Sequence, residues 1–269
     1  MSRGAKKWRS IESSIGTTWT SSSGALLGSF VPIERTSICH GAGVRPRVVL
    51  FDIDGTLVDC AGAGRRSMNA AFELEVSAPR ALDGISFGGM TDRAIVRQGL
   101  ERAAVAITEA LIAAVLARYV EHLAAALEAT TTFRVLPGAR DAVLRSRGDH
   151  TAVGLGTGNV RAGATMKLAR GKLDDLFTFG GFGCDAELRA EVLRRGVERG
   201  AESLGVDASS CEVLVVGDTP RDIDAARAIG ASSLAVVTGA ASREDLENAG
   251  PTFLAPTLEH PEALAALGR

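Results

Sequence analysis

Apolar residues in the middle of this 269-residue chain recur with a helical period. From position 111 to position 127 an apolar residue stands at every fourth place, which is typical of the buried face of an amphipathic helix. These residues are Leu111, Val115, Tyr119, Leu123 and Leu127. Thr108-Glu109 ahead of them resembles a helix start. The surrounding sequence is rich in alanine and carries no strand-like pattern, so we expect residues 61–135 to be helical throughout.

On either side of this region the pattern is different. Val48–Phe51 is a continuous apolar run, as in a parallel strand that is buried on both faces. From residue 150 onward, short apolar runs alternate with amphipathic segments. Strands are predicted at 151–156, 178–180, 211–216 and 233–238, and helices at 159–171, 187–204 and 221–229. This alternation predicts an α/β fold with a doubly wound parallel sheet and helices on both of its faces.

The first 44 residues differ from the rest of the chain. They are rich in Ser, Thr and Gly and show only weak periodicity. Basic residues such as Lys6 and Lys7 are present, but no compact apolar segment of the kind found in a targeting peptide follows them. We therefore expect residues 1–44 to form a disordered N-terminal tail.

The composition narrows the class of protein further. The formal net charge of −2 predicts no general affinity for nucleic acid or for an anionic membrane. No apolar run reaches the roughly 18 residues of a membrane span. The cysteines Cys39, Cys60, Cys184 and Cys211 are scattered, without a CxxC pair. This spacing indicates neither a zinc site nor a disulfide framework and favours a reducing cytoplasm.

Two carboxylates follow the first predicted strand. Asp52 and Asp54 are separated by one residue, and Gly55 and Thr56 then break the strand. Residues i and i+2 of an extended chain point to the same side, and two close like charges are unfavourable unless a cation or a proton lies between them. An ordinary turn needs only one such residue. The pair therefore indicates a divalent metal and a reaction that uses a nucleophile beside an acid.

Two further polar residues follow predicted strands. Thr157 comes directly after the strand at 151–156, and Asp218 follows the strand at 211–216. In a doubly wound sheet, functional residues gather at the carboxyl ends of the strands. We therefore expect Asp52, Thr157 and Asp218 to lie in a single site.

These stretches resemble the conserved motifs of the haloacid dehalogenase (HAD) superfamily of phosphohydrolases. Asp52–Leu57, of the form DxDGTL, resembles motif I, Thr157 resembles motif II, and Gly217–Asp222, GDTPRD, resembles the acidic motif IV. Their order and spacing suit the phosphoglycolate phosphatase-like branch. The resemblance implies a HAD-like Rossmannoid core formed by residues 45–60 and 136–269, with residues 61–135 inserted as an all-α cap domain.

The resemblance also implies an activity, the Mg²⁺-dependent hydrolysis of a small phosphate monoester that is phosphoglycolate-like or a sugar phosphate. Asp52 would be the nucleophile that forms an aspartyl-phosphate. Asp54 would protonate the leaving alkoxide and then take a proton from the attacking water. Asp218 would complete the metal site with Asp52 and the backbone carbonyl of Asp54, since hard oxygen ligands suit Mg²⁺. Asp222, one helical turn further, could hold a metal-bound water.

Phosphate binding is expected at two turns. Gly55 and Thr56 would turn the chain sharply and leave backbone N–H groups free to hold phosphate oxygens. Thr157 would donate its hydroxyl to the same phosphate, together with a backbone N–H of Gly158 or Asn159. Asn159 fits equally well as the N-cap of the following helix.

The motif III cation departs from the usual pattern of the superfamily. Many relatives carry Lys-Pro at the start of the helix before motif IV, and this chain has no Lys-Pro. Arg189 occupies about that place and could neutralise the nucleophile and the phosphate, although its planar fork has a different reach. Lys167, on the helix after motif II, is the second candidate.

Substrate choice is expected to lie in the cap. Gly88–Arg93 resembles the GxTD-type cap loop of phosphoglycolate phosphatase-like proteins, which makes Thr91 and Arg93 candidate substrate-binding residues. An arginine of this region could bind a substrate carboxylate bidentately. The candidates are Arg65, Arg66, Arg93 and Arg97.

Two other functions remain open at this stage. A phosphomutase of the same superfamily would use the same Asp52 and Asp54, with a cap that holds a bisphosphate and excludes water. A non-catalytic binding or regulatory protein could keep the fold, although loss of Asp52 or Asp54 would mark it and both are present. In each case the expected partner is a small phosphorylated metabolite, and the expected assembly is a monomer or a homodimer.

Overall fold

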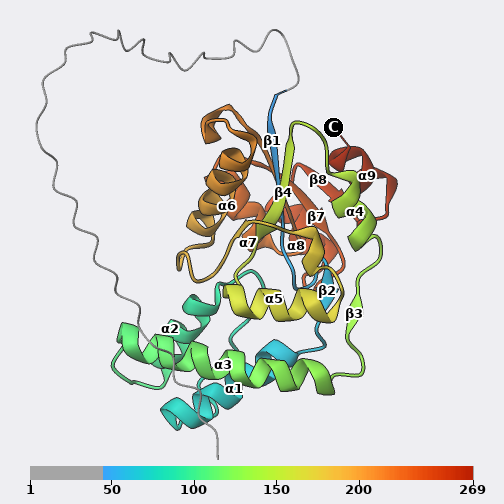
Figure 1. Ribbon diagram of the computed structural model, residues 1–269. Coiled ribbons are helices and arrows are strands. Elements are labelled where there is room, and N and C mark those ends of the chain that lie inside the picture. The colour runs from blue at the N-terminus through green and yellow to red at the C-terminus, as the bar shows by residue number, and fades with distance from the viewer. Residues whose placement is uncertain (1–44, 269) are drawn as a thin grey trace, which may run out of the picture. The chain divides into compact units, whose positions relative to one another are not determined.

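A six-stranded parallel sheet forms the centre of the structure, a computed structural model that describes residues 45–268 (Figure 1). The strand order is β5-β4-β1-β6-β7-β8. The strands are β1 (Arg47–Phe51), β4 (Thr151–Gly156), β5 (Gly180–Gly181), β6 (Glu212–Gly217), β7 (Ser232–Val236) and β8 (Phe253–Ala255). All five residues of β1 are buried, because this strand is central and covered on both faces. The α/β fold class predicted from the sequence is confirmed.

The register brings three strand ends to the same level. Phe51, the last residue of β1, pairs with Leu155 of β4 and with Val216 of β6. The residues that follow these three strands therefore emerge at one edge of the sheet. In the strand order, β1 lies between β4 and β6, which are both distant from it in sequence. Three separate segments of the chain therefore contribute residues to this edge.

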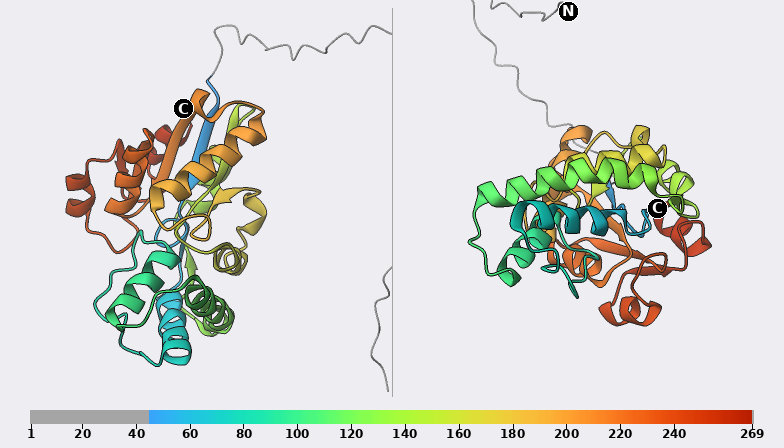
Figure 2. Two further views of the ribbon diagram at one scale, coloured as in Figure 1. Left: turned by 90° about the vertical axis from the view of Figure 1, so that its left-hand side faces the viewer. Right: turned by 90° about the horizontal axis from the view of Figure 1, so that it is seen from below.

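Helices cover both faces of the sheet (Figure 2). Successive side chains of β1 point to opposite faces: Val49 and Phe51 belong to one apolar cluster, Val48 and Leu50 to another. The first cluster includes residues of α4, α5 and α9, and the second includes residues of α6 and α7. The helices of this part are α4 (Ala139–Arg145), α5 (Arg161–Arg170), α6 (Arg189–Leu204), α7 (Pro220–Ala228), α8 (Arg243–Ala249) and α9 (Pro261–Leu267).

The segment between β1 and α4 contains three helices at the carboxyl end of the sheet (Figure 1). It comprises β2 (Val58–Asp59), α1 (Ala63–Val76), α2 (Asp92–Arg102), α3 (Glu109–Ala129) and β3 (Arg134–Val135). β3 returns the chain by pairing antiparallel with β2, and α3 packs against α1, α2 and α5. The described residues belong to one compact unit, so the division into core and cap domain stays a prediction.

The helical face predicted for α3 is largely the buried one. Val115, Tyr119, Leu123 and Leu127 are buried, whereas Leu111 is only half-buried and Ile112 is buried beside it. The Thr108 hydroxyl accepts a hydrogen bond from the Leu111 N–H at 3.1 Å, which caps the helix as predicted.

The sequence pattern misses several features of the fold. The prediction that residues 61–135 are helical throughout is wrong at 77–91, 103–108 and 130–133, which are turns and irregular segments, and at β3. The first break follows the end of α1, whose C-cap Ser77 has a left-handed backbone conformation (φ 55°). β8, α8 and α9 were not predicted, because short elements give too few residues for a period to be read. The predicted tail, residues 1–44, lies outside the described residues.

One helix of residues 45–268, α3, is long and apolar enough to cross a membrane by length and composition. It has 21 residues and a mean hydropathy of 1.6. Two groups of residues contribute to this hydropathy: alanines on the outer side of the helix, and the buried apolar residues that pack against neighbouring helices. The expectation of no membrane contact therefore stays a prediction.

Candidate active site

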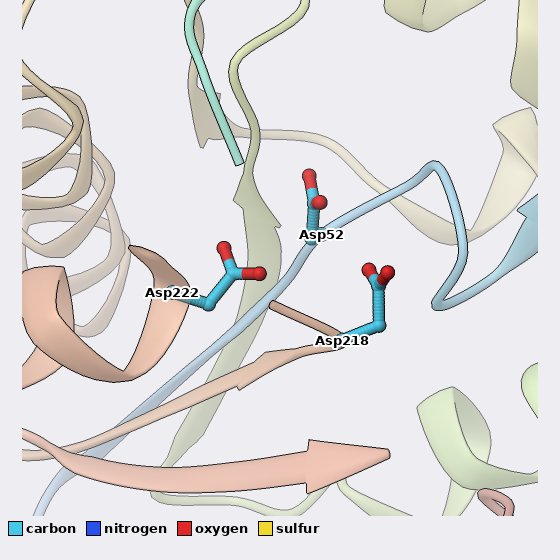
Figure 3. Close-up of side chains that lie close together, drawn as sticks. All are labelled: Asp52, Asp218 and Asp222. Atoms are coloured by element: carbon cyan, nitrogen blue, oxygen red, sulfur yellow. The ribbon is translucent and has the colours of Figure 1, made fainter. Parts of the chain in front are cut away.

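Three buried carboxylates meet at the carboxyl edge of the sheet (Figure 3). Asp52 follows β1, Asp218 follows β6, and Asp222 lies in the first turn of α7. One oxygen from each lies within 4.8 Å of the others, and the three residues are only 5%, 4% and 2% exposed. The structure thus brings together Asp52 and Asp218, as predicted, and adds Asp222 to them.

Arg189 is the cation of this cluster. It is the first residue of α6 and is buried. Its Nη2 lies 3.1 Å from Asp52 Oδ1, contacts Asp222 Oδ1, and donates to the Gly156 carbonyl at 3.2 Å. Burial alone would lower the pKa of Arg189, but Asp222 and Asp52 outweigh it and raise the pKa, so the guanidinium stays charged. The first candidate for the motif III cation therefore lies beside Asp52.

The cluster carries more negative than positive charge. Burial raises the pKa of Asp52 to about 6, and Asp222 and Asp54 add to this rise while Arg189 opposes it. Burial, with repulsion from Asp222 and Asp52, also raises the pKa of Asp218 well above its usual value. The Oδ1 atoms of Asp52 and Asp222 are buried and receive no hydrogen bond of good geometry. Three carboxylates against one guanidinium offer hard oxygen ligands and excess negative charge, which fit a divalent cation.

Asp54 lies beside this cluster with a cation of its own. Its Oδ2 accepts a hydrogen bond from Lys167 Nζ at 2.6 Å and from Asn159 Nδ2 at 2.8 Å. Burial tends to raise the pKa of Asp54, but the charge of Lys167 and the hydrogen bonds from Lys167 and Asn159 outweigh this and hold the pKa below its usual value. Lys167, the second motif III candidate, thus also reaches the site, but at the other carboxylate.

The amide of Asn159 connects the two polar turns. Besides Asp54, its Nδ2 donates to Thr157 Oγ1 at 2.8 Å. The N-cap of α5 is Val160, which makes no side-chain cap bond, so the alternative reading of Asn159 as a helix cap is wrong. Thr157 is fully buried, and its hydroxyl oxygen accepts hydrogen bonds from the N–H and the Nδ2 of Asn159. Neither of these bonds uses the hydroxyl proton of Thr157.

The turn at Gly55–Thr56 differs from the expectation in one respect. The Gly55 N–H donates to the Val58 carbonyl at 2.9 Å and the Thr56 N–H to the Ile53 carbonyl at 3.3 Å, so neither is free for phosphate. The Thr56 hydroxyl instead donates to Asp218 Oδ1 at 3.0 Å. Gly55 has φ +80°, and a Cβ there would lie 2.3 Å from Asp218 Oδ2. The turn therefore holds the Asp218 carboxylate in place.

A cavity of about 500 Å³ opens beside these residues, between the edge of the sheet and the segment α1–α3. This is a usual size for a site that binds a small molecule. Most of the predicted site residues line it. They are Asp52, Asp54, Gly55, Gly158, Asn159, Lys167, Arg189 and Asp218. Thr56, Thr157, Thr91 and Arg93 are not among the lining residues.

Thr91 and Arg93 make structural contacts instead. Thr91 is the N-cap of α2, and its hydroxyl donates to the Glu187 carbonyl at 2.7 Å. Arg93 forms an ion pair with Glu109 at 2.7 Å. Both contacts fix α2 against its neighbours, and a role for either residue in substrate binding stays a prediction.

Asp92 is a cavity-lining residue that sequence reasoning missed. Its N–H donates to the Gly158 carbonyl and its Oδ2 accepts from the Val160 N–H, both at 2.8 Å. A Cβ at Gly158 would lie 2.0 Å from the Met90 carbonyl oxygen, so the two loops touch backbone to backbone. The GxTD pattern marked this loop, but only the fold shows that Asp92 clamps it to the turn after β4.

Comparison with known proteins gives the same fold. A family model described as a haloacid dehalogenase-like hydrolase matches residues 46–230. No curated protein matches the chain. Among solved structures, CbbY from Rhodobacter sphaeroides in complex with phosphate is similar with a TM-score of 0.60 at 18% identity, over 82% of this chain and 99% of CbbY.

Two further structures show comparable likeness. A hydrolase from Pseudomonas syringae has a TM-score of 0.55 at 22% identity, over 82% of this chain and 97% of its own. A haloacid dehalogenase-like family protein from Streptococcus pneumoniae has a TM-score of 0.54 at 17% identity, over 83% and 99%. At these identities the likeness establishes the fold.

The environment of Asp92 predicts a pH effect on stability. Burial raises the pKa of Asp92 to about 6, with Lys167 and the Val160 N–H opposing the rise. Between the usual carboxyl pKa of 3.8 and this raised pKa, the folded state keeps a proton on Asp92 that the unfolded state has released. The free energy of unfolding therefore falls as the pH rises between these two values. Asp92→Asn cannot titrate, so it removes this pH dependence, and its side-chain oxygen can still accept the hydrogen bond from the Val160 N–H. We expect the free energy of unfolding of the variant, relative to that of the native chain, to increase by about 2–3 kcal/mol between pH 4 and pH 7.

Urea unfolding with chelator at several pH values measures this difference. The matched control is Asp149→Asn, because Asp149 is exposed and keeps its hydration in both states; its stability should run parallel to that of the native chain. An Asp92→Asn curve that is also parallel to the native one would contradict the prediction.

Proposed function

The chain belongs to the haloacid dehalogenase-like hydrolase family, and we propose that it is a Mg²⁺-dependent phosphatase that hydrolyses a small phosphate monoester. The observation that carries the proposal is the pairing of Asp52 with Arg189 and of Asp54 with Lys167 in the wall of one cavity. Each carboxylate is held by its own cation, so the two are positioned independently in the wall of the same cavity.

Asp52 is the proposed nucleophile. Its carboxylate attacks phosphorus and forms an aspartyl-phosphate while the ester oxygen leaves. Arg189, 3.1 Å from Asp52 Oδ1, offsets negative charge on the carboxylate and on the phosphate. A Mg²⁺ ion held by Asp52, Asp218 and the backbone carbonyl of Asp54, with Asp222 beside them, would stabilise the charge on the phosphate oxygens when bound.

Asp54 is the proposed general acid and base. It protonates the leaving alkoxide in the first step and takes a proton from water in the second, so that phosphate is released and Asp52 is regenerated. The Asp54 side chain is 44% exposed, which lets a leaving group and then a water molecule reach it. The hydroxyl proton of Thr157 and the backbone around Gly158 and Asn159 remain the proposed phosphate contacts.

Arg65 supports a substrate that carries a carboxylate besides its phosphate, such as a phosphoglycolate-like ester. It lines the cavity, its guanidinium lies 3.8 Å above the Phe87 ring, and its Nη2 donates to the Ile85 carbonyl at 2.6 Å. The other cavity-lining cations each face a carboxylate, whereas Arg65 has no carboxylate partner within residues 45–268. A cation held in place by carbonyls and a ring is ready to bind a carboxylate of the substrate.

A phosphomutase is the second candidate, because the same carboxylates would serve it. The difference is the acceptor of the phosphoryl group, which is water for a phosphatase and a second hydroxyl for a mutase. A non-catalytic role is the third. We further propose that the protein acts in the cytoplasm, as a monomer or a homodimer, on a phosphorylated metabolite rather than on nucleic acid or at a membrane.

Phosphate release from a panel of phosphomonoesters tests the proposed function. We expect release that requires Mg²⁺ and that falls by at least about 10³-fold in Asp52→Asn, because an amide cannot form the acyl phosphate. Glu73→Gln, a change of the same kind at an exposed position of α1, is the control and should keep full activity. Full activity in Asp52→Asn or with chelator would contradict the proposal, and transfer to a sugar hydroxyl without free phosphate would indicate the mutase.

A matched pair of substrates tests the role of Arg65. Glycolate phosphate and ethylene glycol phosphate differ in a carboxylate against a neutral hydroxymethyl group. We expect the native enzyme to prefer the carboxylate by about 10–100-fold in kcat/KM and Arg65→Gln to lose that preference, since a charge-assisted contact contributes about 1.5–3 kcal/mol. Arg66→Gln on the same helix, an exposed arginine outside the cavity lining, should keep it. An unchanged preference in Arg65→Gln would exclude this role.

A further inference from the structure

Two buried cations serve this site, and they contact different carboxylates. Arg189 lies beside Asp52, with contacts to Asp222 as well. Lys167 Nζ donates to Asp54 Oδ2 at 2.6 Å and forms no other ion pair within the described part of the chain. The HAD pattern asks for one cation at the nucleophile, so a second cation on the other carboxylate needs its own explanation.

We infer that Lys167 is a positioning residue for Asp54, and that binding of the phosphate is left to Arg189. This inference rests on the proposed function, in which Asp54 is the general acid and base. Under this inference, Arg189 binds the phosphate and Lys167 positions Asp54, so two cations take the place of a single motif III cation.

The hydrogen bonds around Lys167 form a closed triangle. Lys167 Nζ donates to Asp54 Oδ2 and, at 2.5 Å, to Asn159 Oδ1. Asn159 Nδ2 in turn donates to the same Asp54 Oδ2 at 2.8 Å and to Thr157 Oγ1. Two donors from different directions therefore fix one oxygen of Asp54, and Asn159 ties the arrangement to the end of β4. The Cys60 thiol also lies beside the Asp54 carboxylate, and the 44% exposure of the Asp54 side chain leaves room for the reacting group.

Lys167 and Arg189 are similarly buried, at 4% and 8% exposed, so the bonding partners of the two cations distinguish them rather than burial. The Asp54 side chain is 44% exposed, so it offers far more of its surface to the cavity than the ammonium does. The backbone of α1 covers the ammonium, since a Cβ at Gly64 would lie 3.5 Å from Lys167 Nζ. An ammonium has three donors, and Asp54 and Asn159 take two of them. Little of the cation is left to hold a phosphate in the cavity.

The proposed role predicts a loss of rate without a loss of phosphate binding. A general acid must lie within hydrogen-bond reach of the leaving oxygen, and a displacement of about 1 Å costs about 100-fold in rate. Lys167→Met keeps the length of the side chain and removes the hydrogen bonds to Asp54 and Asn159. We expect kcat/KM for an alkyl phosphate to fall about 100-fold, while the inhibition constant of inorganic phosphate stays within about twofold of the native value. Arg189→Lys should raise that constant, because Arg189 holds the phosphate.

The leaving group gives a second readout that a purely structural role would not move. A nitrophenyl phosphate releases a stable phenolate that needs no proton from Asp54. We therefore expect Lys167→Met to slow the alkyl phosphate much more than the aryl phosphate. Lys172→Met, the same change at an exposed lysine, should alter neither. Equal losses on both esters would overturn the inference.

A double-mutant cycle between Lys167 and Asp54 is the decisive experiment. If Lys167 acts through Asp54, Lys167→Met added to Asp54→Asn should change kcat/KM by less than about threefold, because coupled residues are not additive. Losses that multiply, or a raised phosphate inhibition constant in Lys167→Met, would overturn the inference. If Lys167→Met does not fold, as judged by its urea transition, Lys167→Gln replaces it in the cycle.

The same assays separate this inference from the proposed function. Release by the native enzyme that depends on Asp52 supports the phosphatase whatever the cycle gives, and the cycle then decides the role of Lys167. Absence of release by the native enzyme from every ester overturns both.

Discussion

Mutual repulsion among three buried carboxylates is the constraint around which this active site is built. Asp52, Asp218 and Asp222 lie close together with almost no access to water, and in such surroundings like charges interact strongly. Arg189 offsets one of these charges. Hydrogen bonds from Thr56 to Asp218 and from Thr219 to Asp222 reduce the cost further without cancelling it. The divalent cation proposed among these oxygens would complete the balance.

The backbone around the cluster is shaped to leave room for it. A Cβ at Gly239 would lie 1.7 Å from Asp218 Oδ2, and a Cβ at Gly217 would lie 2.4 Å from the carboxyl carbon of Asp222. These glycines end or follow the strands β6 and β7, so the strand ends approach the carboxylates more closely than any other residue would allow. The same constraint thus explains the glycines of the edge and the position of Arg189 at the start of α6.

The sequence predicted those parts of the site that local pattern and strand order decide. Asp52 and Asp218 follow apolar strands, and parallel pairing with a common register brings such positions to one edge. The sequence did not reveal that Lys167 contacts Asp54, because the two residues are 113 positions apart and their contact depends on how α5 packs. Thr91 fitted a loop pattern, yet its hydroxyl bonds Glu187, 96 residues away. Partners of this kind are set by tertiary packing and leave no periodic signal in the sequence.

The central claim, that the buried carboxylates form a cation site, is tested most directly by thermal unfolding with and without Mg²⁺. The account predicts that Mg²⁺ raises the unfolding temperature of the native chain, because a ligand of the folded state alone stabilises it. In Asp218→Asn that increase should disappear, and the variant in chelator should be at least as stable as the native chain, since a buried charge has been removed. An equal increase in both proteins, or none in the native chain, would contradict it.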